Sequence, residues 1–334
     1  MFSISRTVRA RGARVVGSAA LAAISMAALA ACGSGGAADS SGNGTLVIQR
    51  SANSGFEPVL LAQEKGYFKA QGLNVEIKVA SNDISKNIPL VVSGQVQLTE
   101  AGMSSLIAAK SQGLPLQAVL GVQNAGKGSK QDDGCLAPPG SSVTSLAGLE
   151  GRTVGVPTLG NPVQIINNIA MRNAGDDPAK VHYVALSTDA LNAAATSGKV
   201  DAVCTFGLFY DEAVAAGFTP LQGGTVGTLP GAPQVIWIAS NTFASKNSAE
   251  LTKFTAAMNQ AYGYLNSHDA EYRAITAANT TLPKQYIETR PLPVMTAAIS
   301  RSATEAIATE MQKDGFTKST PSANDLVAQT IPDV

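Results

Sequence analysis

Histidine and cysteine are scarce in this chain, with two histidines and three cysteines among 334 residues. None of them lies close to another in the sequence, whereas zinc and iron sites need several such ligands at short spacings. No glycine-rich phosphate-binding loop follows any expected strand, so the sequence has no motif for a nucleotide or a dinucleotide. We therefore expect no metal and no cofactor.

An excess of charge of one sign is also lacking, because 24 lysines and arginines balance 24 aspartates and glutamates. Proteins that bind nucleic acid need clustered basic residues to contact phosphates, and no such cluster follows the first fourteen residues. With 45% hydrophobic and 14% charged residues, the composition is that of a folded globular protein. Nucleic acid is therefore not an expected partner.

The first 31 residues have the features of a secretory signal. Four arginines within the first fourteen residues precede an uncharged, alanine-rich run over residues 15–31, which is the order found in signal peptides. A membrane-spanning helix is the disfavoured alternative, because the run is short for a bilayer and alanine is only weakly apolar. Without these residues, 20 basic residues remain against 24 acidic ones, a net charge of −4.

Residues 29–32 read Leu-Ala-Ala-Cys, which resembles the lipobox of bacterial lipoproteins. The resemblance implies that Cys32 carries the lipid and becomes the first residue after cleavage; the alternative is an ordinary thiol within a signal peptide. Residues 32–44 are expected to form a flexible tether, since 33–44 contain only Gly, Ser, Ala and Asn with one Asp. We therefore expect a lipid-anchored protein on the extracytoplasmic face of the bacterial cell membrane.

The body after residue 44 alternates expected strands and helices. Strands are expected at residues 45–49, 73–80, 96–100, 116–122, 153–156, 181–186, 200–205 and 234–239, and helices at 57–64, 84–93, 104–112, 162–173, 189–196, 249–267, 269–279, 284–289 and 296–313. A loop is expected over 123–142, and everything after residue 247 is expected to be helical. This alternation predicts an α/β protein of two lobes, each a mostly parallel sheet flanked by helices.

A short pattern occurs at the end of one helix in each half. Residues 93–96 read Ser-Gly-Gln-Val and residues 197–200 read Ser-Gly-Lys-Val, and each run leads into an expected strand. The pattern suggests that the two halves are related units. A chance match is the alternative, because glycine commonly ends helices.

Cys135 and Cys204 are the cysteines of the body, in a compartment that permits disulfides. They can pair only with each other, and a disulfide is slightly favoured. Two buried thiols that act as small apolar side chains are the alternative. A catalytic cysteine is least favoured, because neither histidine is near either cysteine in the sequence.

Few groups are available for catalysis. A hydrolytic triad needs a histidine as base, and His182 and His268 are expected at the start of a strand and in a late helix, away from the loops that follow strands. Asp83, Glu100 and Asp211 could pair for acid–base chemistry, but we expect them to be solvated charges. We therefore expect that the protein is not an enzyme.

Binding has more support. In open α/β sheets, ligands bind beyond the carboxyl ends of the strands, where helix N-termini present free N–H groups. The loops at these positions are rich in Ser, Thr, Asn, Gly and aromatic residues, which suits a cleft for a small ligand; they are residues 51–56, 81–85, 102–105, 158–163 and 205–210. The alternative is that these residues are only helix caps and turn formers.

Three segments carry a resemblance to a known family. They are residues 56–75 (FEPVLLAQEKGYFKAQGLNV), 146–157 (LAGLEGRTVGVP) and 197–203 (SGKVDAV). They resemble the nitrate/sulfonate/taurine and thiamine-pyrimidine-precursor binding proteins of ABC importers, and the similarity spans residues 45–239. The resemblance implies a two-lobed periplasmic-binding-protein-like fold of type II that closes on a ligand about a hinge. The expected lobes are 45–125 with 235–334, including a helical C-terminal tail, and 126–234.

The resemblance also implies ligand contacts, residue by residue. In the first lobe they are Ser51, Asn53, Phe56, Asp83, Met103 and Ser104, and in the second lobe Thr158, Gly160, Asn161 and Phe206. Tyr210 and Trp237 are further aromatic candidates for stacking on the ligand, although such residues more often belong to a core. Family members often have an aromatic-acidic-Pro stretch after the last of these strands, whereas residues 205–210 here read TFGLFY, and this departure leaves the specificity open.

The charge of the ligand is also open. The expected cleft loops have no Lys or Arg apart from Arg50 at the edge of one and Lys86 just after another, so an anion would depend on the helix N-termini near Ser104 and Asn161. The aromatic residues could instead stack on a flat heterocycle, and Asp83 would favour an amine or a ring N–H. An organosulfonate or taurine-like anion and an aromatic heterocycle are therefore supported about equally.

These expectations combine into one function and two alternatives. The protein is expected to be a monomeric, lipid-anchored solute-binding protein that delivers a small organic molecule to the permease and ATPase subunits of an ABC importer. The first alternative is an extracytoplasmic sensor that passes ligand occupancy to a membrane receptor. The second, an enzyme of pyrimidine-precursor synthesis on the same fold, ranks last because no reactive histidine can be placed in the cleft.

Overall fold

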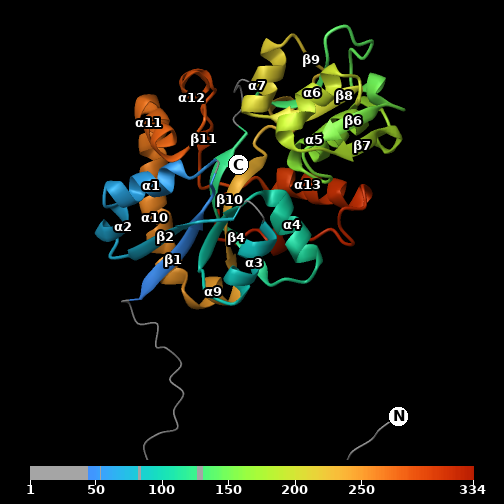
Figure 1. Ribbon diagram of the computed structural model, residues 1–334. Helices are drawn as coiled ribbons and strands as arrows, with labels where there is room; N and C mark the ends of the chain where they lie inside the picture. The colour runs from blue at the N-terminus through green and yellow to red at the C-terminus, as the bar shows by residue number, and fades with distance from the viewer. Residues whose placement is uncertain (1–43, 53, 82–83, 126–130) are drawn as a thin grey trace, which may run out of the picture. The chain divides into compact units, whose positions relative to one another are not determined.

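The computed structural model describes residues 44–52, 54–81, 84–125 and 131–334. The signal segment, Cys32, nearly all of the tether, Asn53 and Asp83 therefore lie outside the described residues. Residues 42–334 form one compact unit, which Figure 1 shows as a ribbon. Among the helices of the described part, none is long and apolar enough to cross a membrane.

The first sheet has six strands in the order β11-β4-β10-β3-β1-β2. β1 pairs in parallel with β2 and β3, while β10 is antiparallel to β3 and β4, and β11 is antiparallel to β4. Its strands are β1 (Thr45–Arg50), β2 (Asn74–Val79), β3 (Leu98–Ala101), β4 (Leu116–Asn124), β10 (Pro233–Ser240) and β11 (Val294–Met295). The chain thus leaves this sheet after β4 and returns to it with β10.

The second sheet has five strands in the order β7-β6-β8-β5-β9. β6 pairs in parallel with β7 and β8, and β5 is antiparallel to β8 and β9. Its strands are β5 (Asp133–Ala137), β6 (Thr153–Val156), β7 (His182–Ala185), β8 (Ala202–Phe206) and β9 (Thr219–Pro220). All of them come from the segment between β4 and β10.

The two sheets share one strand order. In each, three parallel strands are followed by an antiparallel strand and then by a strand that again runs with the first three, as β2-β1-β3-β10-β4 and β7-β6-β8-β5-β9. The expected α/β class is confirmed. Both sheets are mixed and not mostly parallel, because β10 and β5 run antiparallel to the strands on either side of them. The Ser-Gly-x-Val patterns at residues 93–96 and 197–200 precede the equivalent strands β3 and β8, which supports two structurally related halves.

Helices flank both sheets (Figure 1). They are α1 (Glu57–Glu64), α2 (Tyr67–Ala70), α3 (Ile84–Val92), α4 (Met103–Ser111), α5 (Pro162–Ala174), α6 (Leu191–Thr196), α7 (Leu208–Ala215), α8 (Thr225–Thr228), α9 (Asn241–Lys246), α10 (Ser248–Leu265), α11 (Asp269–Asn279), α12 (Lys284–Thr289), α13 (Arg301–Lys313) and α14 (Ala323–Leu326). Local signals set several of these bounds. A proline lies in the first turn of α1, and Gly66 takes φ +73° just after that helix ends.

The structure corrects parts of the sequence-based assignment. Residues 123–142, expected to be a loop, contain the buried strand β5, so Cys135 lies in a strand. The expected helix from residue 296 begins only at Arg301, because Ser300 caps it by accepting from the Ala303 N–H at 3.2 Å. The C-terminal region also includes the short strand β11 and is therefore not entirely helical. The helices α7, α8 and α9 and the strand β9 had no counterpart in the prediction.

The cores show why the strands are buried. On one face of the first sheet, α1 and α10 cover Trp237, which meets the Phe254 ring edge-on at 5.3 Å between centroids and has no exposed surface. In the second sheet, Cys135 and Cys204 occupy paired positions on β5 and β8 and form a buried disulfide. Each sheet therefore has its own apolar interior.

Candidate functional site

The first candidate loop follows β1. The Ser51 N–H donates to the Glu100 carboxylate at 2.6 Å, which ties the loop to the end of β3. The Arg50 guanidinium donates to the Ser51 carbonyl at 3.0 Å and lies 4.7 Å from the centre of the Phe56 ring. Within the loop, the Ser54 N–H points at the Ser51 hydroxyl at 3.4 Å. The Arg50 side chain is therefore engaged with its own loop.

Glu100 is a buried carboxyl group beneath this loop. It is 3% exposed, so the expectation of a solvated charge is wrong. Burial raises the pKa of Glu100 well above its usual value, the nearby Glu57 raises it further, and the Ser51 N–H and Arg50 oppose the shift. Glu100 ends an expected strand, two residues after Leu98, which is buried. Side chains two positions apart in a strand point to the same face, so this spacing was the signal in the sequence that Glu100 is buried.

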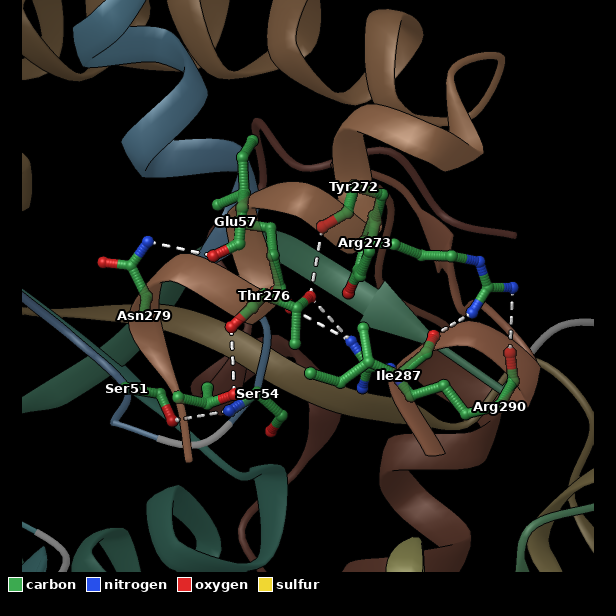
Figure 2. A network of polar contacts seen from close by, with 11 residues as sticks. Ser51, Ser54, Glu57, Tyr272, Arg273, Thr276, Asn279, Ile287 and Arg290 are labelled. Carbon is green, nitrogen blue, oxygen red and sulfur yellow. Dashed lines mark hydrogen bonds and ion pairs between the residues drawn. The ribbon is translucent and has the colours of Figure 1, made fainter. Parts of the chain in front are cut away.

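A polar network joins α1 to the C-terminal helices (Figure 2). Glu57, the first residue of α1, is fully buried and accepts from the Thr276 hydroxyl at 2.7 Å and from Arg290 at 3.2 Å. Arg290 also donates to the Thr276 hydroxyl at 3.0 Å. Arg273 donates to the carbonyls of Ile287 and Arg290, at the end of α12. These contacts fix α12 and the residues after it against the start of α1.

The loop before α5 is organised by a helix cap. The Asn161 carbonyl oxygen accepts from the N–H groups of Val163 and Gln164 at 3.0 and 3.2 Å, and its amide donates to the Thr158 carbonyl at 2.6 Å. Gly160 has φ +73°, and a Cβ there would lie 3.0 Å from the Phe316 ring. The Asn161 side chain therefore serves the N-cap, whereas Thr158 is exposed.

The exit of β8 meets α12. Gly207 has φ +58° and ψ −131°, and its N–H donates to the Asp132 carbonyl at 2.7 Å. A Cβ at Gly207 would lie 3.1 Å from the Tyr286 hydroxyl oxygen. Phe206, the last residue of β8, is 46% exposed. The exposed Phe206 and the glycine that adjoins the Tyr286 hydroxyl are thus consecutive residues at the carboxyl end of a strand.

The same junction is acidic. Burial raises the pKa of Asp132 to about 6, and the neighbouring charges of Asp133 and Asp211 act in the same direction. Burial raises the pKa of Tyr286 to about 12, with Arg290 opposing the shift. The Asp133 carboxylate is committed to Thr225, whose N–H donates to it at 3.0 Å. Positive charge at the junction comes from Arg290, which is already paired with Glu57.

The predicted contact residues fall into three groups. Ser51, Ser104, Thr158, Gly160 and Phe206 lie at the carboxyl ends of strands and keep exposed surface. Phe56, Met103, Asn161, Tyr210 and Trp237 are buried, and Trp237 and Phe56 have no exposed surface. Asn53 and Asp83 lie outside the described residues. The structure thus brings partly exposed candidates to the strand ends of both sheets and places most of the aromatic ones in cores.

Sequence reasoning missed Asp132 and Tyr286. Asp132 precedes the unexpected strand β5, and Tyr286 belongs to α12, which was interpreted as part of a tail. The signal available for Asp132 was its position beside a second aspartate, shortly before the apolar residues 135–137. Nothing local to Tyr286 indicates that it meets a glycine 79 positions earlier.

Both histidines lie on the surface. His182 begins β7 and is exposed, and the exposed His268 stacks on Tyr264 with ring centroids 3.8 Å apart. Within the part of the chain that the structure describes, no group of three or more His, Cys, Asp or Glu side chains is arranged to hold a metal ion.

Two sheets with this common strand order, and polar loops at the carboxyl ends of their strands, define a periplasmic-binding-protein-like fold. The NMT1/THI5-like family model matches residues 53–272, and the chain belongs to this family. The periplasmic aliphatic sulphonate binding protein SsuA of Escherichia coli superposes with a TM-score of 0.71 over 86% of this chain and 98% of that one, at 19% identity. This likeness shows a shared fold.

Two curated relatives match over part of their length. The formylaminopyrimidine-binding protein of Halalkalibacterium halodurans is 26% identical over 232 residues, which are 66% of this chain and 65% of that protein. A 4-amino-5-hydroxymethyl-2-methylpyrimidine phosphate synthase of Saccharomyces cerevisiae is 34% identical over 99 residues, which are 29% of this chain and 27% of the synthase. The chain therefore matches about a quarter of the length of the yeast enzyme.

Proposed function

We propose that this protein is a lipid-anchored, extracytoplasmic solute-binding protein that captures a small organic molecule between two lobes and delivers it to an ABC importer. The proposed lobes are residues 45–125 with 235–334, and residues 126–234. One observation carries the proposal. The loops after β6 and β8 meet Phe316 and Tyr286, which belong to the C-terminal region of the first lobe. The carboxyl ends of strands in the second sheet therefore adjoin the first lobe, where a ligand can touch both.

The proposed contacts are the candidates that keep exposed surface. They are Ser51, Ser104, Thr158 and Phe206, with the addition of Asp132 and Tyr286. Hydroxyl groups, an aromatic face and a carboxylate suit a ligand that is flat and carries N–H groups. We propose an amino-substituted nitrogen heterocycle as the ligand, and the name of the formylaminopyrimidine-binding relative agrees with this class.

An organosulfonate is the second candidate ligand, because the SsuA proteins that share the fold are named as sulfonate-binding proteins. Such an anion would need free positive charge. The Arg50 guanidinium is held by the Ser51 carbonyl and the Phe56 ring, and that of Arg290 by Glu57 and Thr276. The helix N-terminus at Ser104 would remain as the main attraction for an anion. The arrangement therefore favours the heterocycle.

Thermal unfolding tests the binding proposal. Residues 42–334, which form one compact unit, would be shown free of ligand by mass spectrometry and heated with aminopyrimidines, flavins, taurine, alkanesulfonates, nitrate and bicarbonate. A ligand at a hundred times its dissociation constant adds about 2.7 kcal/mol, which raises the midpoint by several degrees. A shift confined to aminopyrimidines supports the proposal, and a shift confined to sulfonates selects the second ligand class. No shift with any compound would count against solute binding.

The anchor and the partners need separate experiments. A labelled fatty acid supplied to the cells should be incorporated into the parent chain and not into the Cys32→Ser chain. Equal incorporation into both chains, or none into the parent, would contradict the anchor. Co-purification of permease and ATPase subunits with the anchored protein separates delivery to an importer from the alternative role as a sensor. Catalysis is not part of the proposal, because both histidines are exposed and neither is among the proposed contacts.

A further inference from the structure

Helix α13 lies against helices that belong to both proposed lobes. It packs on α4, which follows β3 of the first sheet, and on α5, which follows β6 of the second. Figure 1 shows α13 directly beneath α5 and close to α4. Two loops with candidate ligand contacts lie at the N-termini of these helices. Ser104 is at the start of α4, and residues 158–161 precede α5. One C-terminal helix therefore touches the supports of both loops.

The polar part of this contact centres on Arg172 of α5. Its guanidinium pairs with Glu310 of α13 and, at 2.6 Å, with Asp314 just after it. Asp314 also accepts from the Asn168 amide at 2.6 Å, and the Tyr183 hydroxyl donates to Asn168 at 2.7 Å. The Glu310 side chain is 4% exposed and that of Asp314 10% exposed. The two carboxylates are largely shielded from water, while the Arg172 side chain is 26% exposed, so these pairs are screened less than a surface ion pair is.

The apolar part of the contact is a core shared by the three helices. One buried cluster, which we call the shared core, contains side chains from each of them: Met103, Leu106 and Ile107 of α4, Ile165, Ile166 and Ile169 of α5, and Ala303, Ile307 and Met311 of α13. Moving α5 away from α4 would expose these side chains to water, which is unfavourable. The shared core therefore opposes separation of the two helices.

Where the chain passes between the proposed lobes, Ala125 exchanges backbone hydrogen bonds with Gly231 and Ala232. The contact at the junction of β8 with α12 is slighter than that of α13. The remaining apolar clusters of the described residues each stay within one lobe. At the junction of β8 with α12, Gly207 has no side chain, and a Cβ there would lie 3.1 Å from the Tyr286 hydroxyl oxygen. Little apolar surface opposes separation at this point.

We infer that α13 is a fixed brace that holds the N-termini of α4 and α5 as one preformed half of the ligand site, so that the lobes open and close at the contact of Tyr286 with Gly207. Arg172 is a positioning residue in this arrangement, since it acts through α5. The inference rests on the proposed function for the meaning of the site. The motion itself follows from the unequal contacts and can be measured without a ligand.

Distances between spin labels test the brace in the full-length Cys32→Ser chain, whose buried disulfide does not react with the label. The brace pair is Gln112→Cys after α4 with Asn173→Cys in α5, and the opening pair is Ala216→Cys after α7 with Gln285→Cys in α12; all four positions are exposed. We expect one narrow distance distribution for the brace pair and a broad or double one for the opening pair. Distributions of equal width, or a broader one for the brace pair, would overturn the inference.

Variants of the network separate positioning from folding. Arg172→Met should abolish the narrow brace distribution and leave the opening pair unchanged, and Arg172→Lys should restore part of it. Asp314→Asn gives a milder change should Arg172→Met fail to fold. Lys180→Met, which removes an exposed pair with Glu150 at 2.9 Å, is the matched control and should change neither distribution. A folded Arg172→Met chain with an unchanged brace distribution would refute the role of Arg172, whichever ligand the protein binds.

Discussion

The Arg290 guanidinium and the Glu57 carboxylate form an ion pair at 3.2 Å in which Glu57 has no exposed surface and the Arg290 side chain is 11% exposed. It joins the residue after α12 to the first residue of α1, across 233 positions of sequence. The pair therefore connects the loop that carries Ser51 with the helix that carries Tyr286. This loop and this helix each carry a proposed ligand contact.

Breaking this pair from one side should be costly. Arg290→Met leaves the buried Glu57 carboxylate without its ion-pair partner, and removal of one member of a buried pair typically costs about 3–5 kcal/mol. The expected result is a fall of the unfolding midpoint by many degrees in urea or thermal melts. Lys284→Met removes one member of an exposed pair with Glu288 on α12 and should leave the midpoint nearly unchanged. Equal effects of the two variants would contradict the role given to Arg290.

Replacing Gly207 should destabilise the junction of β8 with α12. An alanine at φ +58° and ψ −131° is strained, at a cost of about 1–3 kcal/mol, and its Cβ would lie 3.1 Å from the Tyr286 hydroxyl. Gly198→Ala is the matched control, because Gly198 also has a positive φ but nothing lies near its missing Cβ. We expect Gly207→Ala to lower the free energy of unfolding more than Gly198→Ala does. The second change Tyr286→Phe should recover part of the loss, and no recovery would show that the contact with Tyr286 contributes nothing.

Asp132 should make stability depend on pH. Burial raises the pKa of Asp132 from 3.8 to about 6, so the folded protein holds this proton more tightly than the unfolded chain does. The resulting stabilisation is complete below about pH 4 and is lost as the pH rises to about 6. Asp132→Asn removes the titrating group, so the difference in melting temperature between variant and parent should grow in favour of the variant between about pH 4 and 7. A constant difference over that range would contradict the raised pKa.

The disulfide should contribute to the stability of the second sheet. Cys135 and Cys204 are 69 positions apart, and loss of a disulfide that closes a loop of such length typically costs about 2–5 kcal/mol. We expect Cys135→Ser with Cys204→Ser to lower the midpoint of unfolding and, since the cysteines lie in β5 and β8, to speed amide exchange in those strands first. Addition of a reductant should lower the stability of the parent and leave that of the double variant unchanged. A response of both proteins to reductant would point to another cause.

Many of the helices and strands in the first part of each lobe could be predicted, because the patterns that specify them lie within a few neighbouring residues. The helix expected at residues 57–64 matches α1, and the strand expected at residues 153–156 matches β6. Asn161 was suggested both as a ligand contact and as a helix cap, and its side chain serves the cap. Its three hydrogen bonds go to residues within three positions, which is why the sequence could indicate that role.

The site was less predictable, because its residues are brought together by distant contacts. Glu100 was expected in water, but it is buried and accepts from the Ser51 N–H, and burial together with the charge of Glu57 raises its pKa. Trp237 was a candidate for stacking on a ligand, but α10 covers it through Phe254. The partners of each side chain come from segments more than a dozen residues away, and the alternation within one strand does not say which segments these are.

The sequence by itself determined the alternation of strands and helices, several helix caps and turns, and the resemblance to binding proteins, because periodicity and capping act over a few residues. Only the tertiary structure decided that β10 returns to the first sheet, that β5 joins the second, and that Tyr286 meets Gly207. Strand pairing and the burial of individual side chains depend on which distant segments pack together. The packing is determined by the burial of apolar surface over the whole chain.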